Sequence, residues 1–172
     1  MKVVSNAGPL IAFAKLGRPD LLKRLYGVVL IPPEVYQGVV VNGLRLGAPD
    51  ADVVQFLIQQ GQIQVLPIKL NIDDPLLSFG IDTGEAQAIA LAHQENADWV
   101  LIDNAHARRA ARSANIPCKG TVGILIEAFR KGILTLADFE LLIHEIKHQP
   151  TLWISEQLCD EALVQIRRES TR

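Results

Sequence analysis

The sequence predicts an α/β domain built on a parallel sheet, and two observations carry this prediction. Short apolar runs alternate with segments of helical periodicity along the whole chain of 172 residues, as expected for repeated strand–helix–strand units. The hydrophobic fraction is 49% but aromatic residues make up only 5%, so the core must consist mainly of Leu, Ile, Val and Ala. Aliphatic strands of this kind suit a sheet covered on both faces, as parallel sheets are.

Strands and helices are expected in a regular order. The strands are the apolar runs at residues 3–4, 28–31, 63–66, 99–102 and 117–119. The helices cover residues 9–25, 33–42, 50–60, 83–96, 105–114, 121–131 and 135–147. Pro32 and Pro33 end the second strand and open a helix, and Gly61 ends the third helix. Residues 67–82 carry two prolines and a glycine and are expected to form a loop.

A tail follows the predicted domain, which we place at residues 1–149. Residues 150–172 begin with an apolar run around Trp153, and Ser155 is a candidate N-cap for a last helix over 156–168. Apolar residues recur along that helix at amphipathic spacing, at Leu158, Ala162, Leu163 and Ile166. We therefore expect the tail to pack on the domain or on a second subunit.

Composition and motifs narrow the function classes. A net charge of -2 gives no global attraction to nucleic acid or to an anionic membrane. Cys118 and Cys159 form neither a metal-ligand pair nor a disulfide framework, and no apolar stretch reaches membrane-spanning length without a polar break. We therefore expect a soluble cytoplasmic protein with no membrane partner. The chain also lacks the glycine-rich dinucleotide motif, the phosphate-loop motif and the nucleophile elbow.

Polar residues collect where predicted strands end. Ser5 and Asn6 follow the first strand, Asp103 and Asn104 follow the fourth, and residues 82–85 open a helix. In open α/β sheets, ligands bind outside the carboxyl ends of strands, at the point where the strand order reverses. These side chains are therefore expected to face one crevice.

Glu85 has two interpretations. On a helix over 83–96 it shares the apolar face with Ala88 and Ile89, so its carboxylate points toward the protein and needs a partner. One interpretation is a capping box, with Asp82 as N-cap and Glu85 at the third helical position. The other is a functional site.

Asp103 and Asn104 are open to the same two interpretations. Either residue can cap a helix over 105–114. Taken together, however, Glu85 and Asp103 are carboxylates on two elements that can face one crevice. Oxygen ligands in such an arrangement suit Mg²⁺ or Mn²⁺.

Three arginines begin beside these carboxylates. Arg108 and Arg112 share one helix face, and Arg109 lies three residues before Arg112. The stripe could hold phosphate groups of a nucleic acid. The other interpretation is an ordinary solvated helix face.

Six stretches, taken in order, carry a family resemblance: VVSNAGPLIA (3–12), LIPPEVY (30–36), DTGEAQAIALA (82–92), VLIDN (100–104), KGTVG (119–123) and WIS (153–155). Together they span most of the chain. The pattern resembles the PIN-domain superfamily, and more closely its VapC-like branch of unassigned function, which is often found beside small antitoxin-like proteins.

The resemblance implies a three-layer α/β/α sandwich with a five-stranded parallel sheet in the order 3-2-1-4-5. It also implies a divalent-metal-dependent ribonuclease, in which acidic residues bind Mg²⁺ or Mn²⁺ and a metal-held water attacks the RNA phosphodiester. Many members are toxins restrained by a small antitoxin-like partner, and a homodimer is the family's habit.

This chain departs from the family pattern at three positions. The family's first acid falls at Asn6, the acid that commonly adjoins Asp103 is Asn104, and an acid of the helix after the second strand would fall near Gln37-Gly38. We therefore expect Glu85 and Asp103, with Asp82 close by, to hold the metal. Asn6 and Asn104 would complete the catalytic site, and Arg108, Arg109 and Arg112 would contact RNA.

The missing charges leave two hypotheses open. One is a VapC-like ribonuclease whose activity the amides would reduce, because hard dications bind mainly to charged oxygen. The alternative is a catalytically silent PIN-like module that binds nucleic acid or protein.

Overall fold

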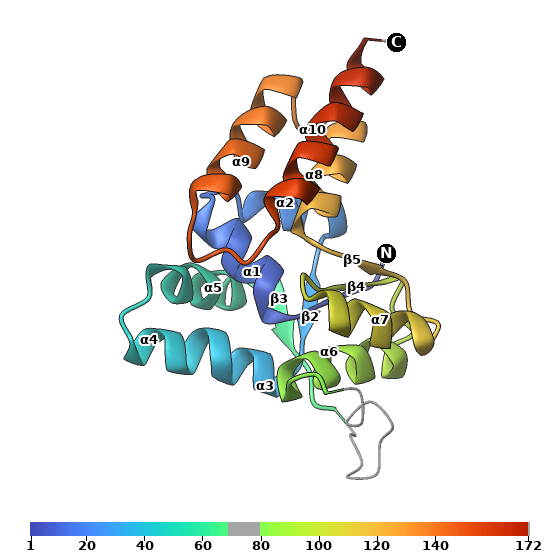
Figure 1. Ribbon diagram of the computed structural model, residues 1–172. Helices are drawn as coiled ribbons and strands as arrows, with labels where there is room; N and C mark the ends of the chain where they lie inside the picture. Colours follow the sequence, from blue (N-terminus) through green and yellow to red (C-terminus); the bar gives the residue numbers. More distant parts are fainter. Residues whose placement is uncertain (69–79, 172) are drawn as a thin grey trace.

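The computed structural model describes residues 1–68 and 80–171. Its five parallel strands lie in the order β3-β2-β1-β4-β5, and helices cover both faces of the sheet (Figure 1). This confirms the predicted fold and strand order. The strands are β1 Val3–Ser5, β2 Val29–Ile31, β3 Ile63–Val65, β4 Trp99–Leu101 and β5 Cys118–Lys119. Since β1 lies between β2 and β4, the order reverses there, and the carboxyl ends of β1 and β4 form the switch point.

The helices divide between two layers. They are α1 Ala7–Lys15, α2 Asp20–Tyr26, α3 Pro33–Tyr36, the π-helix η1 Gln37–Asn42, α4 Gly43–Arg45, α5 Pro49–Gln59, α6 Thr83–Gln94, α7 Ala105–Ser113, α8 Thr121–Arg130, α9 Leu136–His148 and α10 Glu156–Ser170. Neighbouring strand residues face opposite layers. Val3 belongs to the core shared with α1, α2, α8 and α9, whereas Val4 belongs to the core shared with α6 and α7.

The structure corrects the prediction of one helix over 9–25, which is divided into α1 and α2. The chain turns at Gly17, whose φ is 64°, a left-handed conformation that glycine adopts without strain. The Arg18 N–H donates to the Phe13 carbonyl at 2.9 Å, and the Gly17 N–H donates to the Ala14 carbonyl at 3.1 Å. These two bonds form a Schellman motif, which ends α1.

One other predicted boundary differs. The helix expected over 33–42 continues through η1 and α4 to Arg45. There Gly43 lies so close to α5 that a Cβ on it would stand 2.7 Å from the Ala51 Cβ. The apolar run around Trp153 lies between α9 and α10 and belongs to neither helix nor strand. Residues 69–79 of the predicted loop lie outside the described residues.

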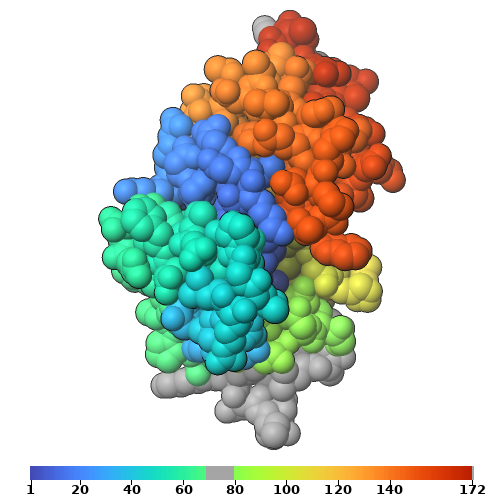
Figure 2. Space-filling model, turned by 90° about the vertical axis from the view of Figure 1, so that its left-hand side faces the viewer, coloured from blue at the N-terminus to red at the C-terminus, as the bar shows by residue number. Residues whose placement is uncertain are grey.

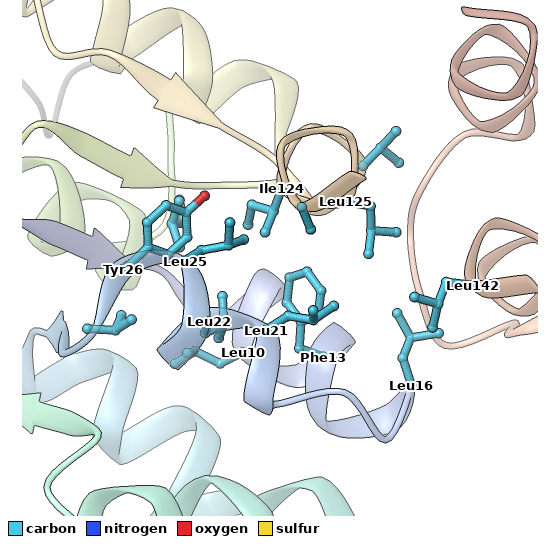
Figure 3. Packing of buried hydrophobic residues seen from close by; sticks show 14 of the residues in the cluster. Leu10, Phe13, Leu16, Leu21, Leu22, Leu25, Tyr26, Ile124, Leu125 and Leu142 are labelled. Atoms are coloured by element: carbon cyan, nitrogen blue, oxygen red, sulfur yellow. The ribbon is translucent and has the colours of Figure 1, made fainter. Parts of the chain in front are cut away.

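The larger core joins the N-terminal and C-terminal helices. Phe13 of α1 packs with Leu21 of α2 and Leu125 of α8, and Leu16 faces Leu142 of α9 (Figure 3). Figure 2 shows the orange surface of α9 directly beside the blue N-terminal helices. The C-terminal helix α10 packs on α8 and α9. It buries Cys159, Ala162 and Ile166, and the Ser155 side chain accepts from the Leu158 N–H as the predicted N-cap.

Candidate functional site

A cleft of about 860 Å³ lies at the carboxyl ends of β1 and β4. All five residues of the predicted catalytic and metal site line it: Asn6, Asp82, Glu85, Asp103 and Asn104. They come from four places in the fold, namely the ends of β1 and β4 and the first turns of α6 and α7. The switch point therefore brings together residues that are nearly a hundred positions apart in sequence.

Asn6 lies at the end of β1, where the chain enters α1. Its backbone N–H donates to the Leu101 carbonyl at 2.9 Å, which fixes it beside β4. The side chain is only 8% exposed, yet within residues 1–68 and 80–171 it finds no hydrogen-bond partner. Its Oδ1 stands 3.5 Å from where a Cβ on Gly84 would lie, an ordinary van der Waals distance, so Asn6 lies next to the first turn of α6. The amide oxygen is thus left available to a ligand in the cleft.

Glu85 and Asp82 form the predicted capping box of α6. The Glu85 N–H donates to Asp82 Oδ1 at 2.7 Å, and the Asp82 N–H donates to Glu85 Oε2 at 3.1 Å. Burial raises the pKa of Glu85 and the nearby Asp82 charge raises it further, while the bond from Asp82 N–H and the Asn104 side chain oppose the rise. The capping interpretation is confirmed, but it does not exclude a second role, because Glu85 also lines the cleft.

Asn104, and not Asp103, caps α7. The Asn104 side-chain oxygen accepts from the His106 N–H at 2.8 Å. The same side chain favours the charged form of Glu85, which places Asn104 next to that carboxylate. Asn104 therefore joins the helix terminus to the acidic site.

Asp103 is held by α8 instead. Its Oδ1 accepts from the Thr121 N–H at 2.7 Å, and its Oδ2 accepts from the Thr121 hydroxyl at 2.8 Å. Burial raises the pKa of Asp103, against the lowering effect of both Thr121 bonds and of Arg108. Two glycines leave room for the carboxylate, since a Cβ on Gly8 or on Gly120 would lie 3.0 or 2.9 Å from its oxygens.

The three arginines do not act as one stripe. Arg108 and Arg112 line the cleft, whereas Arg109 is exposed and lies outside its lining. Arg108 Nη1 donates to the backbone carbonyls of Asp103 and Ile102 and so braces the end of β4. The side chain of Arg112 makes no ion pair or hydrogen bond with any other described residue, so its charge is available in the cleft.

The donor set suits a hard divalent cation in chemistry and in charge. Asn6 offers the cleft an amide oxygen without a partner among the described residues, and burial disfavours the charges of Glu85 and Asp103, which a cation would stabilise. In the part of the chain that the structure describes, no three His, Cys, Asp or Glu side chains gather as a metal-binding group. The candidate ligands for an ion are therefore limited to two carboxylates and an amide oxygen of the cleft lining.

The family pattern also expects an acidic residue in the helix after the second strand, near Gln37-Gly38, and no acidic side chain stands at that position here. A smaller pocket next to the cleft is lined by Asn6, Asp82, Glu34 and Gly38, among others. A Cβ on Gly38 would meet no described atom within 4 Å. This glycine thus removes a side chain where the family resemblance expects an acid.

Several residues that shape the cleft were not predicted from the sequence. Thr121 holds Asp103, and Trp153 and Leu158 line the cleft from the tail. The stretches KGTVG and WIS are part of the resemblance, but local pattern gives no sign that they meet Asp103 and Asn6. Their contribution depends on contacts made across the fold.

No helix within the described residues is both long enough and apolar enough to cross a membrane. A family model described as a PIN domain matches residues 2–168. A search of curated proteins found no match to this chain. The family match covers nearly the whole sequence, including the tail, and agrees with the strand order and the cleft described above. This chain belongs to the PIN-domain family.

Proposed function

We propose that the protein is a divalent-metal-dependent ribonuclease of the VapC-like toxin type, with an activity that the amides at positions 6 and 104 reduce. PIN domains generally use divalent metals and bind nucleic acid. The observation that carries the proposal is the meeting of Asn6, Glu85 and Asp103 in one cleft at the switch point. Burial raises the pKa of both carboxylates, which means that it disfavours their charged forms. A bound cation would stabilise those charges, as expected of a functional site.

Each residue of the cleft then has a distinct task. Glu85 and Asp103, with Asp82 beside them, would hold Mg²⁺ or Mn²⁺, and the Asn6 oxygen would add an uncharged ligand. When bound, the ion would supply Lewis-acid stabilisation at a phosphodiester. Asn104 would orient Glu85 and water, and Arg112 would bind a phosphate of the RNA. Arg108 would act mainly by fixing the Asp103 backbone, and the exposed Arg109 would contact more distant phosphates.

A second candidate is the silent module that binds nucleic acid or protein without cleaving it. One observation favours it: both Asp103 oxygens already accept hydrogen bonds from Thr121. A carboxylate held in this way can act as the cap of α8 without any ion. The two candidates differ in one measurable property, which is metal-dependent cleavage.

The test is RNA cleavage by the purified protein with Mn²⁺ or Mg²⁺, by wild type and by Glu85→Gln. We expect EDTA to stop cleavage and Glu85→Gln to reduce it at least a hundredfold, roughly the loss of one strong transition-state interaction. Stability should stay nearly unchanged, because glutamine also completes a capping box. Gln87→Glu, which alters charge on the same helix away from the cleft lining, serves as control. Absence of metal-dependent cleavage in wild type would leave the silent module.

We further propose a small antitoxin-like protein as regulator, a homodimer as the assembly and the cytoplasm as the compartment. The two free cysteines, Cys118 and Cys159, are compatible with a reducing compartment. Mass measurement in solution tests the dimer. Inhibition of cleavage by the product of a neighbouring small gene tests the antitoxin.

A further inference from the structure

The tail places an exposed tryptophan at the cleft. Trp153 is 95% exposed, although tryptophan is on average one of the more buried residue types. Together with Ile154, Ser155 and Leu158 it lines the same cleft as Asn6 and Asp103. A large indole held in water beside a polar site needs an explanation other than folding.

The backbone around Trp153 is fixed on both sides. Leu152 and Ile154 are half-buried against the larger core, and the Ser155 side chain caps α10. The segment joining α9 and α10 passes beside α1 (Figure 1), where Lys15 Nζ donates to Thr151 Oγ1 at 2.9 Å. Leu152 and Ile154 point toward the core and Trp153, between them, points toward solvent. Since the backbone on both sides is already held in place, binding a ligand to the indole should cost little further backbone entropy.

The cleft contains what a nucleotide would need. It holds the available cation of Arg112 for a phosphate and the indole for a base, and its volume of about 860 Å³ is within the range of ligand sites. The other two cations of the lining are committed elsewhere. Arg108 Nη1 donates to the backbone carbonyls of Asp103 and Ile102, and Lys119 Nζ lies 2.5 Å from Glu127 and 4.0 Å from the centre of the Trp99 ring. The indole and the Arg112 guanidinium therefore line the same cleft, each without an ion pair, ring contact or side-chain hydrogen bond among the described residues.

We propose that Trp153 stacks on an unpaired base of the RNA strand whose phosphate lies at Arg112 and the acidic site. This inference rests on the proposed occupation of the cleft by RNA, and it adds the residue that holds a base there, Trp153 of the tail. Bases in a continuous duplex already stack on their neighbours and cannot offer a face to the indole, whereas unpaired bases can. Recognition by stacking tolerates every base, so it sets strandedness more than sequence.

The first experiment measures binding directly. Glu85→Gln/Trp99→Phe protein, which is expected not to cleave, keeps Trp153 as its only tryptophan. It is titrated with a short unstructured RNA of adenosine and uridine in Mn²⁺. We expect the fluorescence of Trp153 to be quenched, and affinity to fall about tenfold when the RNA carries abasic positions or is paired in a duplex.

The second experiment compares variants of the tail. Trp153→Ala in the Glu85→Gln background should weaken binding of the same RNA about tenfold, whereas Trp153→Phe should keep most of the affinity. Leu46→Ala removes another exposed apolar side chain, 85% exposed and outside the cleft lining, and should change nothing. In protein with Glu85 intact, Trp153→Ala should raise KM for cleavage with little change in kcat.

Failure of this inference and failure of the proposed function give different results. If wild type cleaves RNA but Trp153→Ala binds and cleaves as wild type does, the stacking inference is wrong and the nuclease stands. If RNA binds with quenching of Trp153 but no metal cleaves it, the inference stands and the silent module replaces the nuclease. If no RNA binds, both are wrong. A mass that falls from dimer to monomer in Trp153→Ala would then assign the indole to a second copy of the chain.

Discussion

Asp103 owes its position to Thr121, a residue eighteen positions away in the sequence. Hydrogen bonds to a charged group contribute about 1.5–3 kcal/mol each, and the cost is highest when a buried acceptor loses its donor. Thr121 is fully buried and gives Asp103 both its N–H and its hydroxyl. The pair therefore couples the end of β4 to the start of α8 through the acidic site itself.

Thr121→Val tests this coupling. Valine keeps the shape of threonine but removes the bond to Asp103 Oδ2, so the free energy of unfolding should fall by about 1.5–3 kcal/mol. The pKa of Asp103, already raised by burial, should rise further. Thr121→Ser, which keeps the hydroxyl, is the control in urea denaturation. Little loss in Thr121→Val together with a larger loss in Thr121→Ser would show that the methyl group matters and the hydrogen bond does not.

Asn6→Asp tests whether position 6 belongs to the ion site. The new carboxylate would flank Gly84 together with Asp82, so without metal the like charges should cost about 1–2 kcal/mol of stability. Mn²⁺ should bind more tightly than to wild type and restore stability, by about 2.7 kcal/mol at a hundredfold excess over Kd. If metal occupancy limits cleavage, the rate should also rise.

Melting curves with and without Mn²⁺ provide the measurement for Asn6→Asp. Asn42→Asp adds the same charge on the exposed side of η1 and controls for charge alone. If Asn6→Asp gains no more from Mn²⁺ than wild type does, Asn6 is not a ligand and the silent module becomes the better account.

At the scale of elements, the sequence predicts what depends on neighbours along the chain. Apolar periodicity gives α5 as 50–60 against the observed Pro49–Gln59, and α7 as 105–114 against Ala105–Ser113. The capping box of α6 follows from residues three apart. The apolar pattern over 9–25 does not reveal the turn that ends α1, because the apolar spacing continues in phase across Gly17.

What the sequence could not predict depends on contacts across the fold. Asp103 and Asn104 have the same local preference for an N-cap, and only the position of α8 decides that Asn104 caps α7 while Asp103 binds Thr121. The place of Trp153 in the cleft likewise depends on how α9 and α10 return to α1. The convergence of Asn6 and Asp103 was predictable, because strand ends at a switch point converge in any sheet of this order. Glu85 joins them from the first turn of α6, which the strand order alone does not place.

The C-terminal helix allows a matched pair of substitutions. Ile166 is fully buried between α10 and the domain, whereas Val164 is 48% exposed on the same helix. Ile166→Ala should lower the free energy of unfolding by about 2–5 kcal/mol, and Val164→Ala by less than about 0.5 kcal/mol. Deletion of residues 150–172 should expose the apolar surface beneath and cause aggregation or a change of oligomeric state. A truncated protein with unchanged solubility and mass would show that the tail is not part of the packed core.

At the scale of the whole molecule, two groups of carboxylates respond to acid in opposite directions. Burial raises the pKa of Glu85 and of Asp103, so protonation relieves a strain of the folded state, and stability from this source is lost as pH rises. Burial also disfavours the charge of Glu127, but bonds from Lys119, Lys131 and Tyr26 outweigh it and lower its pKa to about 2. The dependence of stability on pH is the difference between these two effects.

The Glu127 cluster joins three elements. Its Oε2 accepts from Lys119 of β5 at 2.5 Å and from the Tyr26 hydroxyl of α2 at 2.7 Å, and its Oε1 lies 2.7 Å from Lys131 Nζ. Because its pKa in the folded state lies below the ordinary 4.5, its stabilisation is complete above about pH 4.5 and is lost as pH falls toward 2.

Glu127→Gln should therefore reduce stability at neutral pH and flatten its decline between about pH 4.5 and 2, which moves the pH of greatest stability toward acid. Urea midpoints across this range provide the measurement. Glu169 is the matched control, because its pKa is also lowered to about 2, by Arg130, but on the surface. Salt screens exposed pairs more than half-buried ones, so the effect of Glu169→Gln should vanish in high salt while that of Glu127→Gln persists. If salt abolishes both effects equally, Glu127 acts as a surface charge and the cluster does not hold β5, α2 and α8 together.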